Sequence, residues 1–257
     1  MPKFSANLGF LWTELTLPDA IRAAHRAGFD AVECHWPYDT DPAAIDAALE
    51  ETGLTMLGLN TSRGATGENG LSALPLRETD ARAAIDEAIT YALRIGTPNI
   101  HVMAGFAKGP QAEATFKANL QYACMQAAPH GMTILIEPLN HYDAPGYFLS
   151  TSAQAKTIIE AVGQPNLKLM FDCYHLQIME GDITRRLTDL MPIIGHIQIA
   201  SVPDRAEPDH GELDHAHLFA HLDALNYAAP VGAEYKPKTT TEDGLGWLKD
   251  ARPKDHG

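Results

Sequence analysis

The sequence predicts a single α/β domain, residues 1–257, folded as a (β/α)₈ TIM barrel. A length of 257 residues suits one large domain of this class. Short apolar segments alternate with helical patterns at a spacing of about 30 residues, the size of one βα unit. The apolar runs are continuous rather than alternating, which is typical of parallel strands covered on both faces. An open doubly wound sheet is the chief alternative, but its G-x-G-x-x-G fingerprint is absent after the first strand, where Gly9 stands alone.

Eight strands are predicted, each from a short run of aliphatic and β-branched residues. In chain order they are FSAN (4–7), AVECH (31–35), TMLGLN (55–60), NIHVM (99–103), TILIE (133–137), LKLMFD (167–172), HIQIA (196–200) and VGAEY (231–235).

The helices between the strands are predicted from apolar periodicity and from the residues at their ends. Residues 18–28 open with proline and close with glycine, as helix ends favour. Residues 41–53 have Asp41 as N-cap and Gly53 as C-cap. Further helices are expected over 78–96, 113–128, 151–163 and 182–195.

Histidines occur in two further arrangements. His217 and His221 have the i, i+4 spacing of zinc ligands, but the apolar residues between them favour an exposed face of an amphipathic helix. His141 and His175 follow strands five and six, where a substrate can reach them.

Composition narrows the classes of partner. The formal charge of −14 repels phosphate backbones and argues against nucleic acid. The chain has no basic amphipathic helix and no apolar run of about 18 residues, so no membrane association is expected. The N-terminal segment lacks the pattern of a signal peptide, and three well-separated cysteines fit buried, reduced thiols. A cytoplasmic protein is predicted.

Polar residues mark the ends of the predicted strands. In a TIM barrel the carboxyl ends of the strands carry the chemistry. The residues at these ends are Asn7, Glu33, His35, Asn60, Glu137, Asp172, Gln198 and Glu234. Three acids and one amide come from the last four strands. Carboxylates gathered at one barrel mouth repel by several kcal/mol unless a cation or protons compensate. Oxygen ligands suit Mg²⁺ or Mn²⁺, although the spacing alone leaves open whether a cation is bound.

Several motifs resemble the hydroxypyruvate isomerase family, within the xylose-isomerase-like barrels. They include I-E-P-L-N-H-Y-D (136–143), the D-x-Y-H block (172–175) and E-Y-K-P (234–237), and matching segments extend along nearly the whole chain. The resemblance implies a divalent metal, Mg²⁺ or Mn²⁺, held by Glu137, Asp172, Gln198 and Glu234. It also implies that Glu137 and Glu234 are the catalytic acid/base pair. Substrate contacts are implied for His175, Arg205, Lys236, Asp143 and Asn7.

The implied reaction interconverts an α-hydroxy aldehyde and an α-hydroxy ketone. One carboxylate removes a proton beside the carbonyl, a second returns or shuttles it, and the metal stabilises the enediolate. Arg205 and Lys236 offer cations for a substrate carboxylate, so a short hydroxy-oxo acid is the predicted substrate. It is hydroxypyruvate, converted to tartronate semialdehyde, or the four-carbon homologue 2-oxotetronate.

Other functions remain open at this point. A ketose 3-epimerase would use the same two glutamates at one carbon, from opposite faces. A metal-dependent phosphodiesterase resembling the abasic-site nucleases is disfavoured by the charge and by Gln198, where a histidine is expected. A barrel that binds a sugar acid without converting it is disfavoured by the intact glutamates. Barrels of this class commonly pair through their helices, which leaves a homo-oligomer open.

The sequence departs from the family pattern in three places. The loop of residues 60–70 looks short and carries Arg63, either a surface charge or a further anchor for an acidic substrate. His35 and Trp36 replace a more usual apolar pair after the second strand, and residues 209–215 are less glycine-rich. These departures bear on the substrate rather than on the predicted metal ligands.

Overall fold

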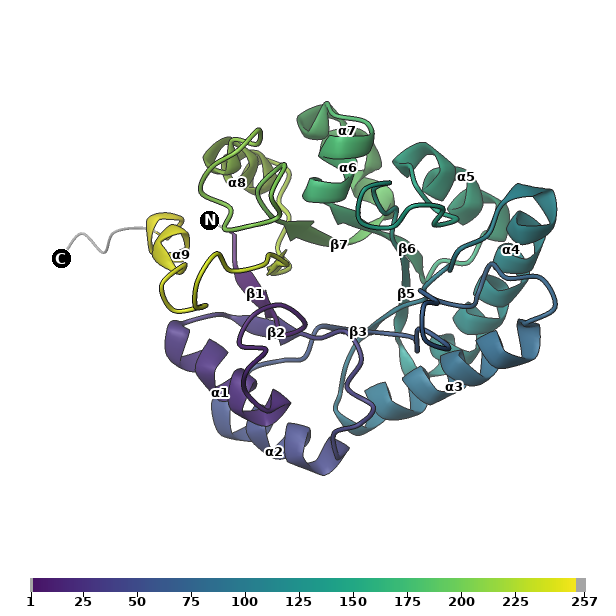
Figure 1. The fold of residues 1–257 in the computed structure, drawn as a ribbon, viewed down its shortest axis with the longest axis horizontal. Helices are drawn as coiled ribbons and strands as arrows, with labels where there is room; N and C mark the ends of the chain where they lie inside the picture. Colours follow the sequence, from purple (N-terminus) through teal and green to yellow (C-terminus); the bar gives the residue numbers. More distant parts are fainter. Residues whose placement is uncertain (1, 253–257) are drawn as a thin grey trace.

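Eight parallel strands form the centre of the molecule, with helices around them (Figure 1). The computed structural model describes residues 2–252, and the TIM-barrel prediction is confirmed. The strands are β1 (Phe4–Asn7), β2 (Ala31–Glu33), β3 (Gly58–Asn60), β4 (Asn99–His101), β5 (Thr133–Ile136), β6 (Leu167–Asp172), β7 (Ile194–Ile199) and β8 (Val231–Ala233). Residue 1 and residues 253–257 of the predicted single domain lie outside the described range.

The strands pair in the order β2-β1-β8-β7-β6-β5-β4-β3. The first strand, β1, pairs with β2 on one side and with the last strand, β8, on the other. The remaining edge, between β2 and β3, is bridged at Val32 and Met56. There the Leu57 amide donates to the Val32 carbonyl at 2.7 Å, and the Cys34 amide donates to the Gly58 carbonyl at 3.1 Å. These bonds join β2 to the segment that leads into β3 and so close the barrel within residues 2–252.

The helices lie outside the strands, where their apolar faces cover the sheet (Figure 1). Asp41 caps α2 through the Ala43 amide, and Gly53 ends this helix in the left-handed conformation, both as predicted. The helices are α1 (Leu17–Ala27), α2 (Pro42–Thr52), α3 (Glu78–Arg94), α4 (Gly109–Ala127), α5 (Ser152–Val162), α6 (Cys173–Met179), α7 (Ile183–Leu190), α8 (His215–Ala224) and α9 (Gly246–Asp250), with short 3₁₀ turns η1 (Ala128–His130) and η2 (Met191–Ile193).

Several predicted boundaries were wrong, for identifiable reasons. Most strands end earlier than predicted, because the residues after β2, β4, β5 and β8 leave the sheet to form the barrel mouth. The predicted helix of residues 182–195 ends at Leu190, and a 3₁₀ turn with Pro192 leads into β7, which therefore starts at Ile194. The short helices α6 and α9 were not predicted. A helix of five to seven residues is too short to show apolar periodicity.

Apolar side chains fill the space between sheet and helices. Phe4, for example, is fully buried and packs edge-on against Phe219 of α8 and Trp247 of α9. The three cysteines are free and buried, as expected for reduced thiols. None of the helices within residues 2–252 is both long and apolar enough to span a membrane.

Candidate active site

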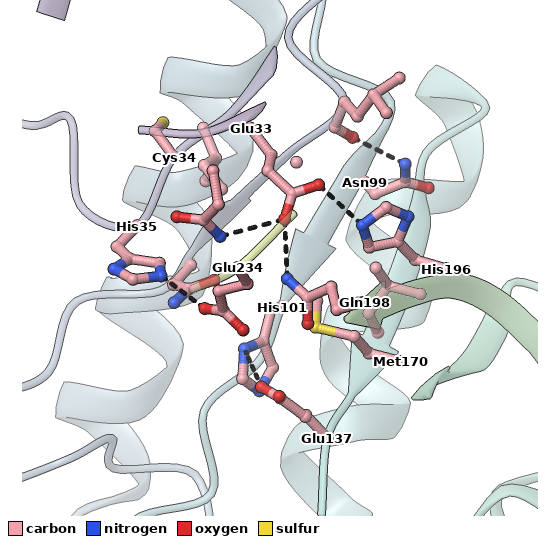
Figure 2. A pocket seen from close by; sticks show the side chains of 16 residues that line it. Glu33, Cys34, His35, Asn99, His101, Glu137, Met170, His196, Gln198 and Glu234 are labelled. Atoms are coloured by element: carbon pink, nitrogen blue, oxygen red, sulfur yellow. Dashed lines mark hydrogen bonds and ion pairs between the residues drawn. The ribbon is translucent and has the colours of Figure 1, made fainter. Parts of the chain in front are cut away.

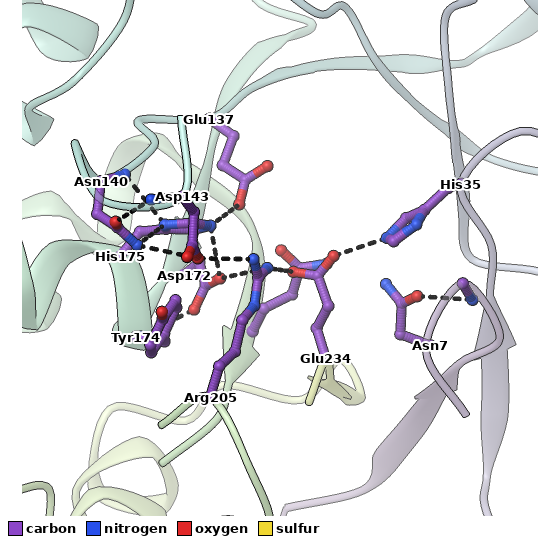
Figure 3. A network of polar contacts seen from close by, with 12 residues as sticks. Asn7, His35, Glu137, Asn140, Asp143, Asp172, Tyr174, His175, Arg205 and Glu234 are labelled. Atoms are coloured by element: carbon purple, nitrogen blue, oxygen red, sulfur yellow. Dashed lines mark hydrogen bonds and ion pairs between the residues drawn. The ribbon is translucent and has the colours of Figure 1, made fainter. Parts of the chain in front are cut away.

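Three carboxylates meet at the carboxyl end of the barrel (Figure 3). Glu137 directly follows β5, Asp172 is the last residue of β6, and Glu234 directly follows β8. All three are buried, with exposed fractions of 6%, 1% and 6%. Glu137 and Glu234 line one cavity of about 360 Å³ at the barrel mouth. The clustering of these three acids, predicted from their places at strand ends, is therefore present.

Glu137 has few polar neighbours. Its Oε1 atom is buried without a hydrogen-bond partner among residues 2–252. The nearest histidine nitrogens, on His101 and His175, lie 3.6 and 3.9 Å from its two oxygens. Burial, together with the negative charges of Glu234 and Asp172, raises the pKa of Glu137 well above its usual range. A buried carboxyl group of this kind needs either a proton or a bound cation to offset its negative charge.

Glu234 lies in the opposite electrostatic environment. His35 contacts its Oε1 atom at 2.7 Å, and Arg205 donates to its Oε2 atom at 3.2 Å. Burial opposes the ionisation of Glu234, but the charge of Arg205 and the hydrogen bond with His35 outweigh it. The pKa of Glu234 is therefore lowered. Gly9 makes this arrangement possible, because a Cβ atom there would lie 2.1 Å from His35 Nδ1.

Arg205 is the central cation of the site. Its guanidinium lies 3.1 Å from Asp143, 3.2 Å from Glu234 and 3.8 Å from Asp172. The rings of Phe10 and Tyr174 each lie about 5 Å from its Cζ atom, at 4.8 and 5.0 Å. Burial disfavours the charged guanidinium, but the surrounding carboxylates more than compensate and raise the pKa of Arg205. The Arg205 guanidinium therefore lies between carboxylates from three segments: the loop after β5, the end of β6 and the residue after β8.

Asp172 and His175 are fixed by the start of α6. Asp172 caps this helix by accepting from the Tyr174 amide at 2.8 Å, while its other oxygen, Oδ2, is buried without a hydrogen-bond partner among the described residues. Burial and the charge of Glu234 raise the pKa of Asp172 to about 7. The backbone amide of Asn140 donates to Nδ1 of His175 at 3.0 Å. Burial lowers the pKa of His175, so its ring is neutral and carries its proton on Nε2.

A metal ion fits this cluster. One ligand atom from each of Glu137, Asp172 and His175 lies within 4.8 Å of the other two, and all three residues are buried. Two of the carboxylate oxygens have no hydrogen-bond partner among residues 2–252. His175 is the weakest of the three candidates, because its Nε2 atom carries the proton and faces the carboxylates as a donor.

Gln198 lies beside Glu33 of β2 (Figure 2), and Asn7 lines the same pocket. The amide nitrogens of Gln198 and Asn7 donate to Glu33 Oε1 at 2.8 and 3.0 Å. Asn7 Oδ1 accepts from the Gly9 amide. Because both polar groups of Asn7 have partners, a direct contact with substrate stays a prediction. Gln198 Oε1 is buried without a partner among the described residues.

The remaining predicted substrate residues line the cavity mouth. Asp143 pairs with Arg205, and Lys236 Nζ lies 5.7 Å from the centre of the Phe10 ring. Arg63 also lines the cavity, with its guanidinium 4.6 Å from the centre of the Trp36 ring. Arg63 is therefore placed at the site rather than on a remote surface. His217, by contrast, is exposed on α8 and contacts Thr184.

Sequence reasoning missed His101 and His196, and it gave no role to Glu33 and His35, which it placed only among the polar residues at strand ends. The two missed histidines stand on strands that were predicted. His196 precedes Gln198 by two residues on β7, so both point to the same face. His101 occupies the last position of β4. The partner of Glu33 depends on which strands face each other across the barrel, and no local pattern gives this.

The barrel and its carboxylate site define the class of protein. Residues 21–251 match the xylose isomerase-like TIM barrel family. The chain therefore belongs to this family, as its motifs predicted.

Within the family, the similar proteins include named isomerases. The 2-oxo-tetronate isomerase of Cupriavidus necator is 47% identical over 255 residues, which cover 97% of this chain and 98% of that protein. The hydroxypyruvate isomerase of Escherichia coli is 39% identical over 259 residues, which cover 98% of this chain and all of that protein (100%). These relatives confirm the prediction of an isomerase, an intramolecular oxidoreductase.

Solved structures agree on the fold. A structure described as an AP endonuclease, family 2, from Brucella melitensis has a TM-score of 0.95 and 41% identity, and covers 98% of this chain and 100% of that one. The 3-keto-D-glucoside 4-epimerase of E. coli has a TM-score of 0.82 at 23% identity, over 97% of this chain and 99% of that one, and shows the fold alone.

Proposed function

We propose that the protein is a metal-dependent isomerase of a short hydroxy-oxo acid, hydroxypyruvate or 2-oxotetronate. The single observation that carries the proposal is the pair of buried glutamates, Glu137 and Glu234, that face one cavity from β5 and β8. The names of the similar enzymes from C. necator and E. coli supply the substrate class.

The proposed metal ligands are Glu137, Asp172, Gln198 and Glu234, with Mg²⁺ or Mn²⁺ as the ion. Support comes from three buried oxygens without hydrogen-bond partners among residues 2–252, one each on Glu137, Asp172 and Gln198. Oxygen donors of this kind suit a hard divalent cation. When bound, the cation would polarise the substrate carbonyl and stabilise negative charge on its oxygen.

Glu137 and Glu234 are the proposed acid/base pair. One glutamate takes a proton from the carbon that bears the hydroxyl group, and the other returns or shuttles that proton to the former carbonyl carbon. The proton of the hydroxyl group passes to the former carbonyl oxygen, so that hydroxyl and carbonyl exchange places. His175 faces the same cavity with its Nε2 proton, so it can donate a hydrogen bond to a substrate oxygen on which negative charge develops. The rings of Phe10 and Tyr174 pack against Arg205 and so limit the positions that its guanidinium can take.

The cations at the cavity differ in whether they already form ion pairs, and this difference indicates where a substrate carboxylate binds. Arg205 is already surrounded by Asp143, Asp172 and Glu234. Lys236 and Arg63 line the cavity without an ion pair to any residue within 2–252, and each cationic group lies over an aromatic ring. We therefore assign the substrate carboxylate to Lys236 and Arg63, and assign Arg205 to a substrate oxygen close to Glu234. A neutral sugar would need neither free cation.

The test is an assay by NMR in D₂O, with Mg²⁺ or Mn²⁺, against hydroxypyruvate, 2-oxotetronate and neutral ketoses. We expect turnover of an oxo acid that EDTA abolishes, with deuterium entering the product. Glu137→Gln and Glu234→Gln should each lower kcat by at least about 100-fold, the usual range for a lost acid or base. Normal turnover by both variants, with metal still bound, would refute the acid/base assignment.

Lys236→Met tests the carboxylate assignment. We expect KM for the oxo acid to rise by at least about tenfold, because a charge-assisted contact of about 1.5 kcal/mol or more is lost. Lys238→Met is the matched control, since Lys238 pairs with Asp204 and does not line the cavity. An unchanged KM for Lys236→Met would refute the assignment.

The same assay separates the alternatives. Turnover of neutral ketoses alone would make the protein a ketose 3-epimerase. Binding of oxo acids without turnover would make it a binding protein. A duplex with an abasic site belongs in the panel, because a similar solved structure is described as an AP endonuclease. Cleavage of that duplex would replace the isomerase proposal.

A further inference from the structure

Glu33 forms a hub of hydrogen bonds beneath the active site (Figure 2). It ends β2, is 4% exposed, and accepts four hydrogen bonds through its two oxygens. Ser5 and His196 contact Oε2, both at 2.8 Å. Asn7 and Gln198 donate their amide hydrogens to Oε1, at 3.0 and 2.8 Å. Nothing in the proposed reaction requires this carboxylate, which points to another purpose.

The contact with Gln198 fixes the direction of an amide. Oε1 of Glu33 is an acceptor, because it also accepts from the Asn7 amide, so the Gln198 side chain must turn its NH₂ group towards it. Its Oε1 atom then faces away from Glu33, and it is buried without a hydrogen-bond partner among the described residues. With the amide reversed, two acceptors would face each other, and an NH₂ group would take the place of the oxygen.

Two neighbours keep Glu33 in place. His196 Nε2 lies 2.8 Å from Oε2 of Glu33, an oxygen that also accepts from the Ser5 hydroxyl. Gly232 on β8 provides the space. A Cβ atom there would lie 2.7 Å from both Glu33 oxygens and 2.8 Å from Cγ of Gln198. Hydrogen bonding and shape therefore both maintain the Glu33–Gln198 contact.

We propose that Glu33 is a positioning residue for the cation site: it orients Gln198 so that the amide oxygen, rather than the amide nitrogen, faces the metal. This inference rests on the proposed metal-dependent function. Partners that orient metal ligands typically change the affinity for the metal by about 10- to 100-fold when they are replaced.

Glu33→Gln makes a sharp test, because it preserves shape. When the new amide keeps its oxygen towards Ser5 and His196, its NH₂ group faces Gln198. Gln198 must then reverse to accept this hydrogen bond, and its NH₂ group turns towards the metal. Asn7 loses the same acceptor, because it also donates to Oε1 in the wild-type protein. In the double variant Glu33→Gln/Gln198→Glu, either oxygen of residue 198 can accept from residue 33 while the other faces the cation.

Mn²⁺ affinity, measured by electron paramagnetic resonance without substrate, is the readout. We expect Glu33→Gln to weaken Mn²⁺ binding by about 10- to 100-fold, and the double variant to recover most of that loss. Ser5→Ala is the matched control, since it removes a hydrogen bond to Oε2 and leaves the Gln198 contact intact. It should leave the Mn²⁺ affinity within about threefold, whatever its effect on Tm.

The outcomes separate this inference from the function on which it rests. Wild-type affinity in a folded Glu33→Gln protein, or no recovery in the double variant, overturns the role of Glu33 alone. If Glu33→Gln does not fold, Glu33→Asp decides the question, because the shorter side chain withdraws the carboxylate from Gln198 and leaves residue 198 unchanged. It should weaken Mn²⁺ binding, and wild-type affinity would overturn the role of Glu33. A wild-type protein that binds no Mn²⁺ overturns both the metal-dependent function and this role.

Discussion

Metal binding should release protons, and the number released follows from the carboxylate cluster. Burial and mutual repulsion raise the pKa of Glu137 well above its usual range and that of Asp172 to about 7. At pH 6 a group with a pKa of about 7 is about nine-tenths protonated. The two groups interact and titrate as a pair, so the pair holds between about one and two protons. Glu234, with its lowered pKa, is ionised and contributes none.

A cation requires both carboxyl groups in the ionised form, so one to two protons should leave for each Mn²⁺ bound at pH 6, as an order of magnitude. The apparent affinity should therefore rise about tenfold per pH unit below pH 7 through Asp172 alone, and more steeply where Glu137 also loses its proton. Titration calorimetry in buffers with different heats of ionisation counts the protons directly.

Asp189→Asn provides the control, because this exposed aspartate of α7 is remote from the cavity and should leave the count unchanged. Saturable Mn²⁺ binding at pH 6 with fewer than about 0.3 protons released would refute the reasoning. Glu137 and Asp172 would then already be ionised in the metal-free protein, and burial would not govern their pKa values.

Two further predictions concern stability and positioning. Arg205→Met in EDTA should destabilise the protein by about 3–5 kcal/mol, since it leaves buried carboxylates unpaired. Thermal unfolding should register this as roughly 6–20 °C in Tm, whereas Arg185→Met, with a side chain 82% exposed, should shift Tm little. Gly9→Ala should displace His35 and lower kcat/KM about tenfold or more. Gly246→Ala, where an added Cβ meets nothing within 4 Å, should leave activity unchanged in the same assay.

Much of the fold and part of the site were predictable from sequence, because their signals are local. Strand runs followed by a single acid located Glu137, Asp172 and Glu234, and topology alone then brings these strand ends to one face. The His35–Glu234 contact joins residues 199 positions apart, and the Glu33–His196 contact joins residues 163 apart. Contacts of this kind depend on which strand ends face each other across the barrel, so alternation along one strand cannot reveal them.

The orientation of Arg205 was unpredictable for a different reason. Its backbone has φ 53°, in the left-handed region that most residues avoid, within the loop after β7. The motif around residue 205 indicated a cation near the substrate. It gave no indication that Asp143, Asp172 and Glu234 would surround the guanidinium. Only the three-dimensional contacts show that Arg205 is paired with carboxylates, whereas Lys236 and Arg63 have no ion pair within residues 2–252.

Arg63 and the three buried acids of the site lie on different kinds of segment. Glu137, Asp172 and Glu234 sit at or beside strand termini that the barrel itself holds rigid, whereas Arg63 lies in the loop between β3 and α3. A loop can be shortened, lengthened or exchanged without altering the hydrogen-bonded ladder beneath it. Substitutions within residues 61–70 should therefore change which substrates enter the cavity, while Glu137, Asp172 and Glu234 keep their places at the strand ends.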